Sequence, residues 1–242
     1  MARRNNHGVT WQTIHLEGAL LLPDLLEQIA KNEATHQKER EYQIPAGLRM
    51  VEEIGRSYQI ARALHDDFKK RQQLASSDAF SLTEGFITKF MSNCLGWNSL
   101  KKTQNKRVGE YSFPIQRIAY EYVPLSIGPF NTSVDTLDSR FAVRGGRKDR
   151  NRSLFQMGQE YLNATGKSSW GLISNGNVIR LLRSSPTLAR PQYLEFDLHA
   201  ILEDDHYAEY MLLWKILHVS RIYDTEYESV MTVWEEWRNE TI

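Results

Sequence analysis

Residues 170–183 read WGLISNGNVIRLLR, and this stretch is the most informative about the fold. The runs 170–174 and 178–182 are rich in the large apolar and β-branched side chains that favour strands. Asn175-Gly176 lies between them, a pair typical of a type I′ turn, in which both central residues need positive φ. The stretch therefore predicts a β-hairpin.

Further strands are expected on both sides of this hairpin. The runs of aromatic and β-branched side chains cover residues 111–115, 118–127 and 193–198. Pro114 and Pro124 point to edge positions or bulges in the first two of them. Apolar side chains three and four residues apart predict a short helix over 153–163, between the second strand and the hairpin.

Helices are expected to frame these strands. Residues 48–71 have the apolar period of an amphipathic helix, and an apolar cluster in 15–32 contains Pro23, which suits a first helical turn. Ser81 and Glu84 match a capping box at the start of a helix that ends before Gly96. Apolar stripes over 207–222 and 227–237 predict two more helices.

This order of elements predicts an α+β fold, an α/β sandwich with a central sheet framed by N- and C-terminal helices. We expect three segments. They are an N-terminal helical segment (1–78), an α/β core (79–200) and a C-terminal helical segment (201–242).

The composition is that of a soluble globular protein. The chain has 242 residues, 41% of them hydrophobic, and 30 basic side chains balance 30 acidic ones. Its apolar runs are far shorter than a membrane span, and no secretory signal follows Arg3-Arg4. Cys94 is the single cysteine, which excludes an internal disulfide. We therefore expect a cytoplasmic protein without a membrane partner.

The charge is unevenly distributed along the chain. Residues 98–153 hold eleven Lys/Arg against five Asp/Glu, a balance of +6, whereas residues 193–242 hold three against twelve, a balance of −9. A basic middle and an acidic end suggest two faces with different partners.

The basic middle is the candidate nucleic-acid contact. Its side chains surround Gly145-Gly146, which indicates a flexible loop, and precede a predicted helix N-terminus that could add backbone N–H donors. The alternative is a solvated loop without a ligand. The predicted DNA-binding residues are Lys101, Lys102, Lys106, Arg107, Arg144, Arg147, Lys148, Arg150 and Arg152. We expect backbone contacts that do not depend on base sequence.

The chain also resembles a known family. Residues 159–183, with QEYLN before the WGLISNGNVIRLLR run, are similar to a segment of restriction-endonuclease-like domains. The runs LEGALLLPDLL (16–26) and YLEFDL (193–198) resemble the N-terminal region of large type IIG-like DNA adenine methyltransferases. These include enzymes of BREX- and DISARM-type phage-defence systems.

The resemblance implies a module of a DNA-modifying enzyme with DNA and a methyltransferase module or other defence subunits as partners. The chain lacks an Asn-Pro-Pro-Tyr-type motif and a glycine-rich cofactor loop. S-adenosylmethionine is therefore implied only for the parent enzyme, and no cofactor is expected in this segment.

The nuclease chemistry implied by such a fold needs an acid on one strand and Glu/Asp-x-Lys on the next, to bind Mg²⁺. Only Asp67-Phe68-Lys69 has an acid two residues before a lysine, and it lies in a predicted surface helix. In the strand that should carry the motif, Pro124 and Ser126 stand near the required positions. We therefore expect a degenerate, non-catalytic nuclease fold.

Two other groups of side chains could bind a metal. Asp135, Asp138 and Glu160 could form relocated Mg²⁺ ligands, which is the alternative hypothesis of an active nuclease. Acids and histidines also gather between residues 195 and 206, but their spacing fits no standard ligand set, and we interpret them as caps and solvated charge.

The apolar stripe over residues 227–237 is a candidate docking surface. Tyr227, Val230, Trp234 and Trp237 share one helical face, and acidic residues surround them. Because tryptophans exposed on one face mark interaction sites, Trp234 and Trp237 are predicted to be less buried in this chain alone than core tryptophans such as Trp170, and to dock a partner or the next module. The alternative is that this face packs against the predicted helix over 207–222.

Overall fold

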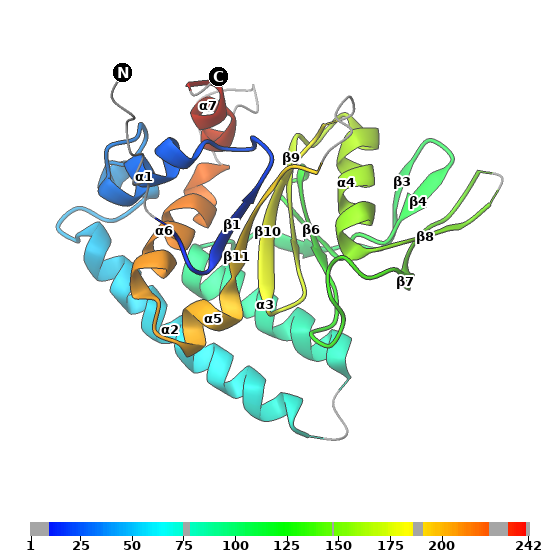
Figure 1. The fold of residues 1–242 in the computed structure, drawn as a ribbon, viewed down its shortest axis with the longest axis horizontal. Coiled ribbons are helices and arrows are strands. Elements are labelled where there is room, and N and C mark those ends of the chain that lie inside the picture. Colours follow the sequence, from blue (N-terminus) through cyan, green and yellow to red (C-terminus); the bar gives the residue numbers. More distant parts are fainter. Residues whose placement is uncertain (1–9, 75–77, 147, 186–190, 223–231, 241–242) are drawn as a thin grey trace, which may run out of the picture.

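The computed structural model describes residues 10–74, 78–146, 148–185, 191–222 and 232–240. At its centre is a seven-stranded sheet with the order β1-β11-β10-β9-β6-β5-β2 (Figure 1). The strands are β1 (Ile14–Glu17), β2 (Leu100–Lys102), β5 (Arg117–Ala119), β6 (Val123–Ile127), β9 (Trp170–Ser174), β10 (Val178–Arg183) and β11 (Tyr193–Asp197). The predicted α+β class is confirmed.

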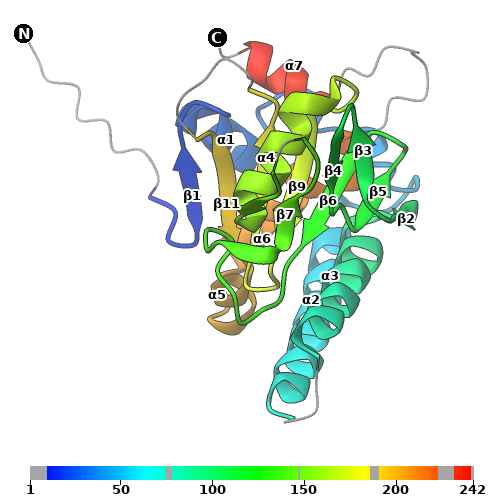
Figure 2. The ribbon, with the colours of Figure 1, turned by 90° about the vertical axis from the view of Figure 1, so that its right-hand side faces the viewer.

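One pair in the sheet is parallel, β6 with β9, and the other neighbours are antiparallel. A parallel pair needs a crossover connection, and helix α4 (Leu154–Thr165) supplies it. Figure 2 shows α4 in front of the sheet.

The other helices frame the sheet. They are α1 (Pro23–Lys31), α2 (Met50–Gln72), α3 (Ala79–Leu95), α5 (Leu198–Glu203), α6 (Tyr207–Leu217) and α7 (Val233–Glu240). Helices α2, α3 and α6 lie on the side of the sheet opposite to α4 (Figure 1). The main apolar core draws residues from the N-terminal helices, the sheet and the C-terminal helices alike. The three predicted segments therefore share one core. Among the described residues, no helix has the length and apolarity needed to cross a membrane.

The β9–β10 hairpin is confirmed, but its turn is not of type I′. Four residues separate the paired Ser174 and Ile179, and only Gly176 among them has a positive φ (+87°). The Asn175 side-chain oxygen accepts hydrogen bonds from the N–H groups of Asn177 and Val178, both at 3.1 Å. The asparagine thus shapes the turn through its side chain, without left-handed backbone.

Two other local predictions are wrong in detail. Helix α3 begins at Ala79 and is capped by Asp78, which accepts from the N–H groups of Phe80 and Ser81, so Ser81 and Glu84 form no capping box. The expected strand 118–127 is a hairpin of β5 and β6, because the chain turns at Tyr120 and Glu121, which have positive φ.

The predicted docking role of Trp234 and Trp237 is contradicted. Both side chains are 0% exposed in this chain alone. Trp234 donates its indole N–H to the carbonyl of Ile216 (2.7 Å), and Trp237 donates to the carbonyl of Thr35 (3.0 Å). The tryptophan face of α7 therefore packs against the chain's own core. The predicted positions 227 and 230 of the same stripe lie outside the described residues.

Candidate nucleic-acid interface

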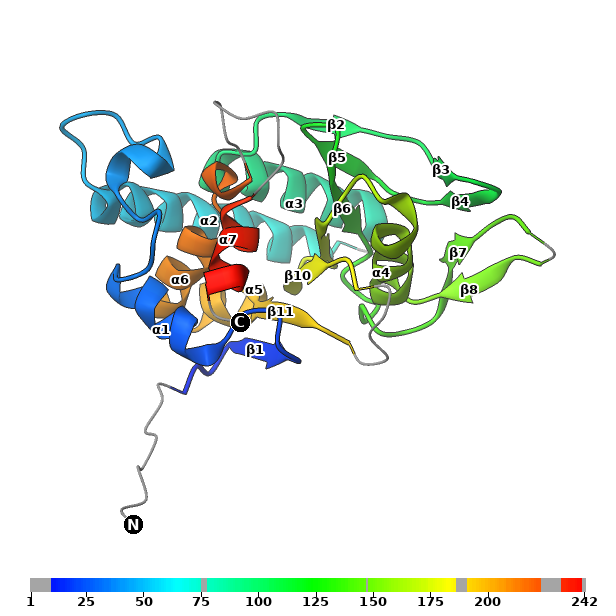
Figure 3. The same cartoon turned by 90° about the horizontal axis from the view of Figure 1, so that it is seen from above.

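Two hairpins lie outside the main sheet and project from one end of the molecule (Figures 1 and 3). The first pairs β3 (Lys106–Val108) with β4 (Tyr111–Phe113), and the second pairs β7 (Asp138–Val143) with β8 (Arg150–Arg152). We call residues 106–113, 138–146 and 148–152 together the basic arm. Strand β2, which carries Lys101 and Lys102, precedes the arm at the edge of the main sheet.

The two hairpins are joined to each other. Ser112 and Arg144 exchange two backbone hydrogen bonds, with N···O distances of 2.7 and 3.1 Å. Gly145 has a φ of +112°, and a Cβ on it would lie 2.1 Å from the carbonyl oxygen of Glu110. Gly145 therefore permits a close approach between the hairpins, a more specific role than the predicted flexibility of the loop.

Substituting Gly145 should weaken the contact between the two hairpins. Alanine at this φ is strained and clashes with the backbone, so we expect the arm to lose about 2 kcal/mol or more of local stability. The amides of Ser112 and Arg144 should then exchange hydrogen faster in Gly145→Ala than in the native protein.

Gly109→Ala is the matched control for this change. Gly109 also has a positive φ (+58°), but nothing lies within 4 Å of a Cβ placed there. It carries the backbone strain without the clash, so its effect should be smaller. Equal exchange rates in both variants would contradict the proposed close approach.

The nine predicted DNA-binding residues differ in their surroundings. Lys101 binds Glu121 at 2.6 Å, and its hydrogen bond lowers the pKa of that carboxyl, so the pair adds no net charge. Arg150 and Arg152 both bind Glu160. Arg147 lies outside the described residues. Lys102, Lys106, Arg107, Arg144 and Lys148 form no ion pair with any acid in the described part of the chain.

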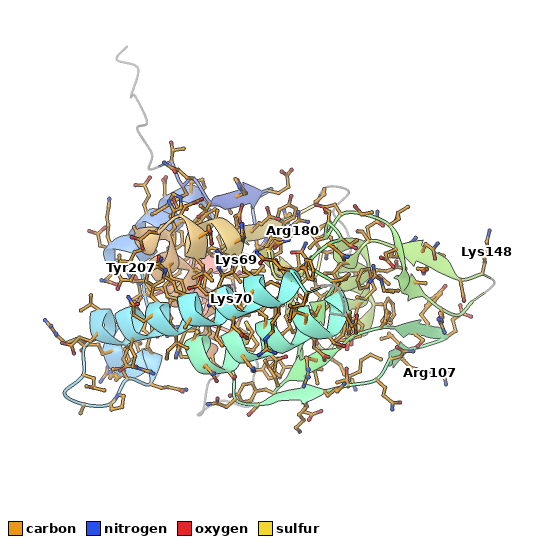
Figure 4. The ribbon with its side chains drawn as sticks, turned by 90° about the horizontal axis from the view of Figure 1, so that it is seen from below. Lys69, Lys70, Arg107, Lys148, Arg180 and Tyr207 are labelled. Atoms are coloured by element: carbon orange, nitrogen blue, oxygen red, sulfur yellow. The ribbon has the colours of Figure 1, made fainter. Side chains whose placement is uncertain are left out.

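The unpaired cations are accessible. Lys102, Arg107, Arg144 and Lys148 are exposed, and Lys106 is half-buried. Figure 4 shows Arg107 and Lys148 on different hairpins, with side chains that point away from the body of the protein. Exposed cations that no carboxylate neutralises create a positive potential that attracts polyanions.

The predicted contribution of a helix N-terminus is contradicted. At the start of α4, Ser153 is buried and its hydroxyl accepts from the N–H of Gln156 (3.1 Å). The N–H of Phe155 donates to the carbonyl of Val134 (3.0 Å). These donors are used within the protein, so a phosphate contact at this place would rest on side chains alone.

The carboxylates proposed as relocated metal ligands do not converge. Asp135 makes two hydrogen bonds of 2.7 Å with Arg180, whereas Glu160 binds the arginines of β8. Asp138 binds Arg140, and this hydrogen bond holds the pKa of the aspartate below its usual range. Each carboxylate thus has its own guanidinium partner. Among the described residues, no group of three or more His, Cys, Asp or Glu side chains could hold a metal ion.

The strand expected to carry the nuclease motif is buried throughout. All five residues of β6 are buried, and Ser126 is 1% exposed. No residue of this strand has an ionisable side chain. The family's catalytic pair therefore has no counterpart on β6.

The acid and histidine residues of 195–206 serve several separate structural contacts. Asp197 caps α5 by accepting from the N–H of Ala200 (2.9 Å), and Asp205 accepts from the hydroxyl of Tyr58 (2.8 Å). His199 faces His65 across 3.1 Å, and burial lowers the pKa of His65 to about 4. The interpretation as caps is confirmed for Asp197, whereas Asp205 and His199 have specific side-chain partners and are not simply solvated charge.

Three features of the interface were absent from the sequence analysis. These are the joint between the hairpins, the pairing of Lys101 with Glu121 and the binding of two arginines by one glutamate. The Gly-Gly pair in the sequence indicates the positive φ at Gly145. No feature of the sequence indicates the ion pairs, because their partners lie on other elements.

Comparison with known proteins identifies no relative: no family model, no curated protein and no solved structure matches this chain.

Proposed function

We propose that this chain binds the phosphate backbone of DNA through the basic arm and β2, without reading the base sequence and without cleaving the strand. The observation that carries the proposal is a set of four exposed cations that have no acidic partner among the described residues. They are Lys102 on β2, and Arg107, Arg144 and Lys148 on the two hairpins that the Ser112–Arg144 hydrogen bonds join. Cations of this kind supply the sequence-independent part of DNA binding.

Two observations support the part of the proposal that excludes strand cleavage. Strand β6 lacks ionisable side chains, and the three candidate carboxylates are each bound to arginine. An arginine bound to a carboxylate competes with any divalent cation for the same oxygens. Metal-dependent hydrolysis needs at least one carboxylate free to bind the ion.

The biological setting of the proposal rests on the resemblance to type IIG-like methyltransferases of phage-defence systems. In that setting the chain is a non-catalytic, cytoplasmic DNA-binding module. A methyltransferase module that binds S-adenosylmethionine, or another defence subunit, would be its protein partner. Since α7 buries its tryptophans internally, this partner would dock on a different surface from the one predicted.

Fluorescence anisotropy with short labelled duplexes tests the proposal. We expect two duplexes of unrelated sequence and equal length to bind with the same affinity, and both to remain intact after incubation with Mg²⁺ or Mn²⁺. A strong preference for one duplex would contradict backbone recognition. Metal-dependent cleavage that is lost in Asp138→Ala or Glu160→Ala would instead support the nuclease alternative.

A further inference from the structure

One carboxylate in the basic arm is bound by two arginines. Arg150 and Arg152 are two residues apart on β8 and therefore extend from the same side of the strand. Arg150 donates from Nη2 to one oxygen of Glu160, and Arg152 donates from Nε to the other oxygen at 2.7 Å. Both oxygens of this carboxylate, which belongs to α4, are thus occupied by arm cations.

This cluster lies within reach of solvent. The side chains of Arg150, Arg152 and Glu160 are 39%, 26% and 25% exposed. The Arg150 guanidinium also lies over the ring of Tyr111, 5.1 Å from its centre, so the neighbouring hairpin helps to hold it in place. The Arg150 guanidinium is therefore held both by Glu160 and by the ring of Tyr111.

The geometry suits a second kind of anion. A phosphodiester presents two non-bridging oxygens with one negative charge, as a carboxylate does, and arginine binds both groups through directed N–H donors. Two guanidiniums that already bind the two oxygens of one carboxylate can therefore bind the two non-bridging oxygens of a phosphodiester. A partly exposed ion pair stabilises a protein only weakly, so another anion can replace the glutamate at small cost.

We propose that Arg150 and Arg152 form a phosphodiester site that Glu160 fills in the free protein, and that a DNA phosphate enters in exchange for this carboxylate. The inference rests on the proposed function and adds that Glu160 limits the affinity of the protein for DNA. While Glu160 is in place, the two arginines contribute little to binding, and when it leaves they join the four exposed cations.

Glu160→Gln tests the exchange, because the amide keeps the shape of the side chain but not its charge. With a short duplex as the probe, we expect affinity to rise about tenfold in 0.1 M salt. The slope of log K against log[salt] should steepen by about 0.9 to 1.8, the value for one or two more phosphate contacts. Thermal unfolding of the variant shows whether the fold is kept.

Glu110→Gln is the matched control. Glu110 is an exposed acid in the turn of the first hairpin, and it does not bind the arginine pair in the structure. It removes the same charge from the same arm, so a general electrostatic effect would appear in both variants. Only Glu160→Gln should steepen the salt slope.

A double variant, Arg150→Gln with Arg152→Gln, separates exchange from a purely structural role. Alone it should weaken binding by less than about threefold, and combined with Glu160→Gln it should remove the whole gain in affinity. If the native protein binds DNA and Glu160→Gln binds no more tightly, the exchange is wrong while the proposed function stands. If neither protein binds DNA at any salt concentration, the proposed function itself fails.

Discussion

Replacing Lys102, Arg107 and Lys148 together with glutamine is expected to weaken binding of duplex DNA by about 10² to 10³-fold in 0.1 M salt. The estimate follows from counterion release, which contributes close to one order of magnitude per phosphate contact at this salt concentration. These side chains are exposed and form no ion pair within the described structure, so their neutralisation should leave the fold intact. The measurement is a titration of labelled duplex, with circular dichroism as the check on folding.

A second triple variant serves as the control for this result. Lys31, Lys38 and Arg40 are also exposed. Lys31 is the last residue of α1 and the other two follow it in the chain, and Figure 1 shows α1 at the end of the molecule opposite to the basic arm. Changing them to glutamine alters the net charge by the same amount. If this control weakens binding as much as the arm variant does, the contact is not localised to the arm.

Trp234→Ala is expected to produce the largest loss of stability, about 3 to 5 kcal/mol in the free energy of unfolding. The indole is fully buried, and its ring centre lies 5.6 Å from that of Trp170 and 6.5 Å from that of Trp97. Its removal leaves a cavity and takes the N–H donor away from the carbonyl of Ile216. Urea unfolding followed by circular dichroism measures the change.

Val51→Ala is the control for this measurement. Val51 also lies on a helix, but it is 53% exposed, and its truncation should change stability by less than about 0.5 kcal/mol. A similarly small effect of Trp234→Ala would contradict the buried position of the indole and restore its predicted docking role.

The parts of the fold that depend on short stretches of sequence could be predicted. The β9–β10 hairpin is such a case, because the strand preference of its flanks and the turn pair Asn175-Gly176 act within fourteen residues. Strand β1 could not be predicted. It is four residues long and pairs with β11, where Ile14 lies opposite Phe196. A pairing over that separation depends on the assembled core rather than on local preference.

The C-terminal tryptophans show where periodicity stops being informative. The spacing of Trp234 and Trp237 correctly indicates one apolar helical face, but it does not say which surface that face meets. In the structure the two indoles reach the backbone carbonyls of Ile216 and Thr35, groups that any sequence contains. A buried face and a docking face therefore look the same in the sequence.

The candidate site shows the same division between local and distant information. The concentration of arginine and lysine in residues 98–153 is a property of the sequence, and the structure places those of the predicted cations that it describes on the arm and on β2. Whether each cation is available depends on partners brought by other elements. Glu160 on α4 binds two arginines, and Glu121 at the β5–β6 turn binds Lys101.

The salt dependence of DNA binding tests the central claim most directly. Four exposed cations, three on the basic arm and Lys102 on β2, predict that log K falls with log[salt] with a slope of at least about −3.6, at 0.9 per contact. In the Lys102, Arg107 and Lys148 triple variant the slope should become shallower by about 2.7. A slope near zero for the native protein, or an equal slope for both proteins, would contradict backbone binding through the basic arm.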